Sequence, residues 1–103
     1  IIYVLENPGM PGMVKLGRTR DLEQRLRDVH STGVAYPFRV VCWVDVDESL
    51  GLEAQLHLLL DPWRVNGRRE FFALPAHQAQ ALVLRTAGAM ASRASPEAWS
   101  TPR

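Results

Sequence analysis

Arg25 is a charged residue at a position where a helix needs no charge in order to fold. Leu22, Leu26 and Val29 recur at helical spacing and predict one apolar stripe, and Arg25 lies on its flank. A guanidinium stays charged and can bind two phosphate oxygens at once, which makes Arg25 a candidate anion ligand. The structural alternative is an ion pair with a carboxylate close in sequence, that of Asp21, Glu23 or Asp28.

Glu53 and His57 form a second candidate pair, because residues four apart share one face of a helix. Magnesium binds proteins through one or two carboxylates and keeps several waters, so Glu53 is a candidate metal ligand. His57 could orient Glu53, contact a phosphate or join the metal. The alternative for both residues is an ordinary polar side chain on a solvated helix surface. Zinc metalloprotease chemistry is disfavoured, because no second histidine lies at zinc-ligand spacing.

Tyr3 and Lys15 lie in two apolar segments that are predicted to pair as antiparallel strands. Tyr3 is a candidate to activate or hold a water molecule. A phenol titrates at about pH 10, however, and is a poor base at neutral pH unless its pKa falls. Lys15 could lower that pKa if strand pairing places its ammonium beside the phenol. The alternative is that Tyr3 packs as an ordinary strand residue.

These side chains must be positioned by the first half of the chain. Strands are predicted over residues 1–5 and 13–17, joined by a loop with two Pro-Gly turn signals. A helix is predicted over residues 21–31. Gly17 lies where the second strand leads towards this helix, and it is predicted to supply either a positive φ or a close backbone approach.

The middle of the chain is predicted to add a strand, a helix and a short apolar run. Residues 38–46 are predicted to form a central strand, because both of their alternating faces are partly apolar. A helix capped by Asp47 or Ser49 is predicted to run to about Leu60. The apolar run 70–74 is expected to dock on the sheet as a short strand or a turn.

The end of the chain is predicted to separate into a helix and a tail. A last helix is predicted over residues 76–87, with Gly88 as its stop. The segment 92–103 is rich in Ser, Pro, Arg and Ala, and it is predicted to be a flexible tail or linker. One α/β domain of the α+β type is therefore predicted over residues 1–91, with an antiparallel sheet packed by helices.

Composition limits the class of protein. Hydrophobic residues make up 47% of the chain and charged residues 22%, which is typical of a globular domain. Apolar runs are too short or too interrupted by charge to span a membrane. The single Cys42 forms no internal disulfide and fits a reducing cytoplasm. Between residues 15 and 39 there are six basic residues against three acidic ones, a distribution that suits a phosphate-facing rim.

Five short motifs follow one another along residues 1–84. They are Ile1-Ile2-Tyr3, Val14-Lys15-Leu16-Gly17, Leu52-Glu53, Arg64-Val65-Asn66-Gly67 and Glu70-Phe71-Phe72, with Thr19, Asp21, Leu22, Arg25 and Leu26 following the second. In this order they resemble the GIY-YIG nuclease superfamily, and more closely its T5orf172 branch, also described as the meiotically up-regulated gene 113 domain type. The resemblance implies a three-stranded antiparallel sheet flanked by helices. It also implies hydrolysis of DNA phosphodiester bonds with one divalent metal.

The resemblance implies a role for each candidate residue. Arg25 would bind the scissile phosphate, Glu53 would hold Mg²⁺ or Mn²⁺, and Tyr3 with Lys15 would manage the attacking water. Lys15 stands where the wider superfamily has a tyrosine, which either retunes the base or removes one aromatic contributor. Further contacts to phosphate or DNA are predicted from Arg18, Arg20, His57, Arg64, Asn66, Arg68 and Arg69.

Two functions of different class are therefore expected. The first is a metal-dependent DNA endonuclease module of the cytoplasm. The second is a catalytically inactive nucleic-acid-binding or regulatory module with the same fold. DNA is the expected partner, with no membrane. The start at Ile1 suggests an excised domain. Because the domain is small, a second DNA-recognition module in a longer parent chain is expected, and a homodimer is the alternative.

Overall fold

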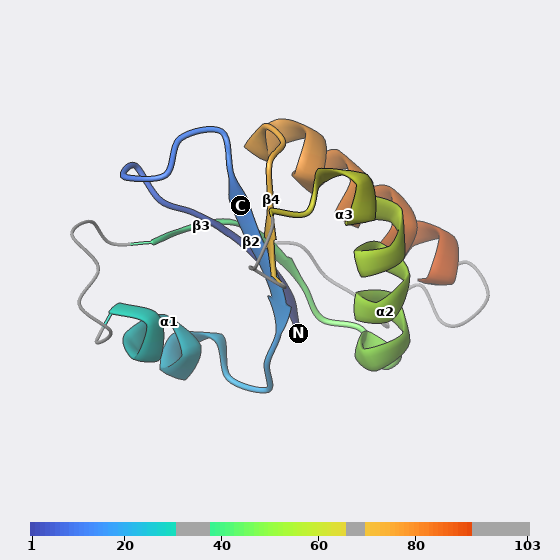
Figure 1. Ribbon diagram of the computed structural model, residues 1–103. Coiled ribbons are helices and arrows are strands. Elements are labelled where there is room, and N and C mark those ends of the chain that lie inside the picture. Colours follow the sequence, from blue (N-terminus) through green and yellow to red (C-terminus); the bar gives the residue numbers. More distant parts are fainter. Residues whose placement is uncertain (31–37, 66–69, 92–103) are drawn as a thin grey trace.

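The computed structural model describes residues 1–30, 38–65 and 70–91, and it has the predicted α+β class (Figure 1). An antiparallel sheet has α1 on one face and α2 with α3 on the other. No helix in the described ranges is long and apolar enough to cross a membrane. The elements are β1 (Ile2–Glu6), β2 (Val14–Arg18), α1 (Leu22–His30), β3 (Arg39–Val44), α2 (Ser49–Leu60), a 3₁₀ turn (Asp61–Trp63), β4 (Phe71–Phe72) and α3 (Ala76–Ala91).

The sheet has four strands in the order β3-β1-β2-β4, rather than the expected three. The fourth strand is Phe71–Phe72, which pairs antiparallel with β2 through Val14 and Lys15. The apolar run over residues 70–74 thus takes the first of its two predicted forms, a short strand. Its pairing brings the residue that precedes it, Glu70, next to β2, where the backbone carbonyl of Glu70 accepts a hydrogen bond from Leu16.

The strand β3 lies at the edge of the sheet, so the prediction of a central position was wrong. The central strand is β1, which pairs with both β2 and β3. A bulge explains the misleading pattern, because Val4 pairs with Cys42 while the next residue pairs with Val40, leaving Val41 as an extra residue. Val41 and Cys42 consequently pack on the same core, and Trp43 packs on the opposite one.

Two cores hold the layers together. The larger core lies between the sheet and the pair α2 and α3, where it contains Leu52, Leu56 and Leu60 of α2. The smaller core lies between the sheet and α1, and its buried members are Tyr3, Leu5 and Phe38. The apolar stripe of α1 packs against this smaller core, as its spacing predicts, through Leu22, Leu26 and Val29.

The helix α3 continues through Gly88 to Ala91, so the prediction that Gly88 stops it was wrong. A glycine inside a helix costs only about 1 kcal/mol relative to alanine. The buried residues Ala79, Val83 and Ala87 continue the contact of α3 with the larger core, and this packing outweighs that cost. The predicted tail, residues 92–103, lies outside the described ranges.

Candidate active site

Tyr3 lies in the centre of the sheet with its side chain directed into the smaller core, where it is 0% exposed. Its partner on β2 is Gly17. A β-carbon at Gly17 would lie 2.4 Å from the hydroxyl oxygen of Tyr3, so only glycine leaves room for the phenol. Gly17 therefore serves a close approach, the second of its two predicted roles. It is part of β2 and does not form the turn that follows.

Arg25 reaches the phenol from α1. Its Nη1 donates a hydrogen bond to the hydroxyl oxygen of Tyr3, at 3.3 Å. No ion pair joins Arg25 to a carboxylate in the described parts of the chain, so the structural alternative considered for this arginine is not formed. Asp21, one of the three carboxylates considered, instead accepts a hydrogen bond from the Gln24 amide at the start of α1. The charge of Arg25 thus remains available to an anion.

The hydroxyl of Tyr3 stays protonated at neutral pH. Burial raises the pKa of Tyr3 above its ordinary value of 10.0, and the charge of Arg25 together with its hydrogen bond opposes this. The negative charges of Glu70 and Glu53 raise the Tyr3 pKa further, which places both carboxylates within electrostatic reach of the phenol. The condition under which Tyr3 could serve as a base, a pKa lowered by Lys15, is therefore not met. Lys15 forms an ion pair with Glu70 instead of a hydrogen bond with the phenol.

Lys15 is bound to Glu70, a carboxylate that the sequence placed either beside Arg68 or facing the site. Its Nζ lies 2.5 Å from Oε1 of Glu70 and 5.3 Å from the ring centroid of Phe71, its partner on β4. The lysine side chain is 14% exposed, so the ion pair neutralises a charge that is mostly withdrawn from water. The pairing of Glu70 with Lys15 was not predicted, because it depends on the register of Phe71–Phe72 against β2.

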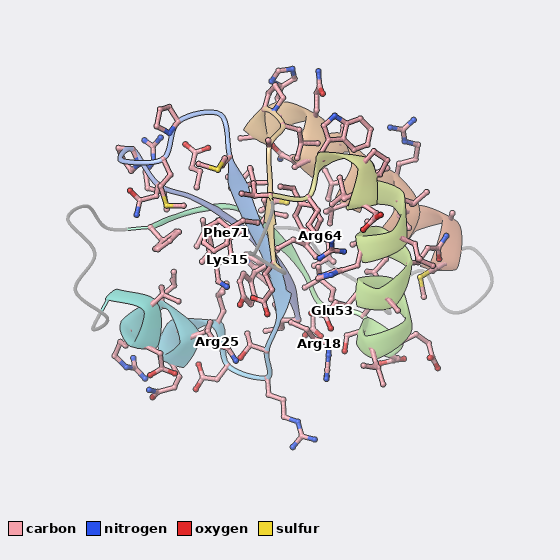
Figure 2. The ribbon with its side chains drawn as sticks, in the orientation of Figure 1. Lys15, Arg18, Arg25, Glu53, Arg64 and Phe71 are labelled. Carbon is pink, nitrogen blue, oxygen red and sulfur yellow. The ribbon has the colours of Figure 1, made fainter. Side chains whose placement is uncertain are left out.

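Glu53 lies on α2, on the other side of β2 from Arg25 (Figure 2). Its Oε1 is 3.6 Å from Nε of Arg18, the last residue of β2. Glu53 also faces a hollow of about 660 Å³. The hollow is lined by Leu50, Glu53, Ala54, His57, Asp61, Arg64 and Glu70. Three carboxylates, an imidazole and a guanidinium therefore border one space.

This donor set fits a divalent cation of the magnesium type. The described ranges contain no group of three or more His, Cys, Asp or Glu side chains placed to hold a metal ion, so they form no closed protein cage. Magnesium does not need one, because it binds through one or two carboxylates and completes its shell with water and phosphate oxygens. Of the three carboxylates on the wall of the hollow, Asp61 is paired with Arg64 inside the same hollow, which leaves Glu53 and Glu70 as the ones that could serve.

His57 and Arg64 are held together beneath the same hollow. Nε2 of His57 is buried without a hydrogen-bond partner among the described residues, and its ring meets Phe72 edge to face at 5.5 Å. Arg64 lies over the same Phe72 ring, donates to the His57 carbonyl and forms an ion pair with Asp61 at 3.0 Å. Arg64 is thus fixed in place by the protein before any ligand binds.

The remaining predicted DNA contacts do not gather in the hollow. Arg20 is exposed and lines a different surface depression, which lies at the start of α1 and is also lined by Trp43 of β3. The predicted contacts Asn66, Arg68 and Arg69 lie outside the described ranges. The structure therefore brings Tyr3 and Arg25 into contact, places Lys15 on Glu70, and places Glu53 on Arg18.

Comparison with known protein families identifies the family to which the chain belongs. The family model described as the T5orf172 domain matches residues 1–87. This match confirms the family resemblance that the motifs predicted, and it places these residues with the GIY-YIG-like nucleases. No curated protein and no solved structure matches the chain.

Proposed function

We propose, because the chain belongs to the T5orf172 domain family of the GIY-YIG-like nuclease superfamily, that it is a metal-dependent DNA endonuclease module. It hydrolyses phosphodiester bonds at a single-metal site. The observation that carries the proposal is the contact between Arg25 and Tyr3. An arginine hydrogen-bonded to a neutral hydroxyl, and ion-paired with no described carboxylate, keeps its full charge for a phosphate.

Arg25 binds the non-bridging oxygens of the scissile phosphate. Negative charge on these oxygens increases as the bond to the attacking water forms and the bond to the leaving oxygen breaks. Because α1 is fixed to the sheet by its apolar stripe, the guanidinium is positioned before the substrate arrives. This preorganisation is what makes a single cation effective in the transition state.

Tyr3 holds an oxygen atom and does not act as the base. Its hydroxyl oxygen accepts from Arg25, which leaves the hydroxyl proton to donate to a phosphate oxygen, while the attacking water loses its proton to solvent. The raised pKa of Tyr3 keeps that proton in place at neutral pH. Lys15 and Glu70 act together as a neutral pair at the edge of the site.

Glu53 would hold the divalent ion, Mg²⁺ or Mn²⁺, on the side of the hollow formed by α2. When bound, such an ion supplies Lewis-acid stabilisation of the phosphate oxygens and makes water a stronger nucleophile. Arg64 borders the same hollow and supplies positive charge to the DNA backbone. DNA is accordingly the proposed partner.

A catalytically inactive DNA-binding module is the second candidate. Two observations favour it. Glu53 is already paired with Arg18, and Tyr3 is 0% exposed. Both features must change before a metal and a water can be used. Such a module would keep the fold and bind DNA through its basic rim without cleaving it.

Incubation of supercoiled plasmid with the protein and Mg²⁺ or Mn²⁺ separates the two candidates. We expect nicking that EDTA abolishes, and that Glu53→Gln abolishes while DNA binding persists. Arg25→Ala should reduce nicking far more than Arg27→Ala, which removes an exposed charge from the same helix. Metal-independent, salt-sensitive binding without cleavage at high protein concentration would establish the inactive module instead.

A further inference from the structure

Arg18 and Glu53 form an ion pair at the proposed metal site, and the geometry points to a coupling device. We propose that Arg18 is a positioning residue that occupies the Glu53 carboxylate until a DNA phosphate draws the guanidinium away. Metal and DNA would then bind cooperatively. This inference rests on the proposed function, because it takes Glu53 as the ligand of the divalent ion.

The ion pair between Arg18 and Glu53 is long and partly exposed to solvent. Arg18 Nε and Glu53 Oε1 are 3.6 Å apart, whereas the Lys15 and Glu70 pair is at 2.5 Å and the Arg64 and Asp61 pair at 3.0 Å. The Arg18 pair is thus longer than either of these two pairs. The arginine side chain is 37% exposed and that of Glu53 is 23% exposed, so solvent reaches both charges.

The position of Arg18 gives it access to DNA. It is the last residue of β2, and Figure 2 shows it beside Glu53. The backbone of Arg18 is held by pairing with Ile2, whereas its side chain is partly exposed to solvent and is contacted by Glu53 through one long ion pair. A DNA phosphate offers this guanidinium a charged, bidentate acceptor in place of one long contact to a carboxylate.

The two cations compete for one carboxylate. A guanidinium within 4 Å of Glu53 repels a divalent ion that approaches the same oxygens. Exposed ion pairs of this kind are weak, and their strength corresponds to an affinity change of about two- to fivefold. Removal of the Arg18 charge should therefore tighten metal binding by about that factor. By thermodynamic linkage, the factor by which DNA changes the metal affinity equals the factor by which the metal changes the DNA affinity.

Titration with Mn²⁺ alone, followed by electron paramagnetic resonance, tests the proposal without any need for cleavage. We expect Arg18→Met to bind Mn²⁺ about two- to fivefold more tightly than the wild type in the absence of DNA. Arg27→Met is the matched control, because it removes one exposed positive charge from α1 and should leave the Mn²⁺ affinity unchanged. Addition of a cleavage-resistant phosphorothioate duplex should raise the wild-type affinity by a larger factor than that of Arg18→Met.

The outcomes separate this inference from the proposed function. Equal Mn²⁺ affinity for the wild type, Arg18→Met and Arg27→Met, with binding lost in Glu53→Gln, would overturn the coupling and leave the metal site standing. Mn²⁺ binding that survives in Glu53→Gln, or that is absent from every variant, would overturn both. Arg18→Gln serves as a second substitution, and circular dichroism should show that each variant keeps the native helix content.

Discussion

The phenol of Tyr3 lies against Gly17 on the neighbouring strand, and a β-carbon at Gly17 would be 2.4 Å from its hydroxyl oxygen and 2.7 Å from Cζ. We expect Gly17→Ala to destabilise the protein by about 1–3 kcal/mol, the usual cost of overpacking. The displaced hydroxyl would also lose its hydrogen bond from Arg25. Urea denaturation measures the first effect, and plasmid nicking measures the second.

A double-mutant cycle checks that this cost comes from the phenol. In a Tyr3→Ala background the atoms that Gly17→Ala would strike are absent, so the added methyl should cost far less than in the wild type. The same penalty in both backgrounds would show that Gly17 is needed for another reason. Gly88→Ala is a suitable control, because a β-carbon at Gly88 would meet no atom within 4 Å.

The Lys15 and Glu70 pair predicts an asymmetric response to mutation. Glu70→Gln leaves a lysine that is only 14% exposed without its anion, and we expect a loss of about 1 kcal/mol. Lys15→Met should cost less, because the carboxylate left behind is 39% exposed and can be solvated. Urea denaturation of both single variants and the double variant measures the difference. A larger loss for Lys15→Met would contradict the assignment of Lys15 as the buried partner.

Most elements of the fold could be predicted from local periodicity. The stripe formed by Leu22 and Leu26 predicted α1, and turn signals with apolar runs predicted β1 and β2. The place of β3 at the edge depends on pairing between distant segments and on a bulge at Val41, neither of which has a local signal. The continuation of α3 past Gly88 depends on tertiary packing for the same reason.

The candidate site could be predicted only in part. Residue chemistry singled out Arg25 and Tyr3, which the structure brings into contact. The ion-pair partners of Lys15 and Glu53 were not predictable. Glu70 is brought to Lys15 by a two-residue strand, and Arg18 of the sheet contacts Glu53 of the helix layer. The catalytic roles of these side chains remain predictions.

Cys42 predicts a dependence of stability on alkaline pH. Burial raises the pKa of its thiol from 9.0 to about 11. Between these values the unfolded chain releases a proton that the folded chain retains, so stability should fall as the pH rises from 9 towards 11. The total loss is on the order of 2–3 kcal/mol. The thiol's contribution would be complete below pH 9.

Cys42→Val keeps an apolar side chain at this position and removes the titrating group. Urea denaturation of the two proteins at several pH values, under reducing conditions, should show a weaker decline for the variant. A residual decline above pH 10 is expected in both proteins, because burial also raises the pKa of Tyr3 from 10.0. Identical pH profiles for the two proteins would show that the Cys42 thiol is not protected in the folded state.

Tyr3→Phe tests whether the phenol holds an oxygen or removes a proton. The substitution keeps the ring against Gly17 and removes only the group that meets Arg25. We expect the nicking rate to fall about 10- to 100-fold, the loss of one hydrogen bond to a charged group, with DNA binding little changed. Because the Tyr3 pKa is raised above 10.0, the two proteins should have the same pH dependence between about pH 7 and 9.

Arg25→Lys supplies the matching background for that test. If the hydroxyl acts by orienting the guanidinium, Tyr3→Phe should reduce the rate much less in an Arg25→Lys protein than in the wild type. If Tyr3 acts as the base, its loss should reduce the nicking rate equally whether arginine or lysine binds the phosphate. A wild-type rate that rises with pH in a step absent from Tyr3→Phe, together with an undiminished loss in the Arg25→Lys background, would identify Tyr3 as the base.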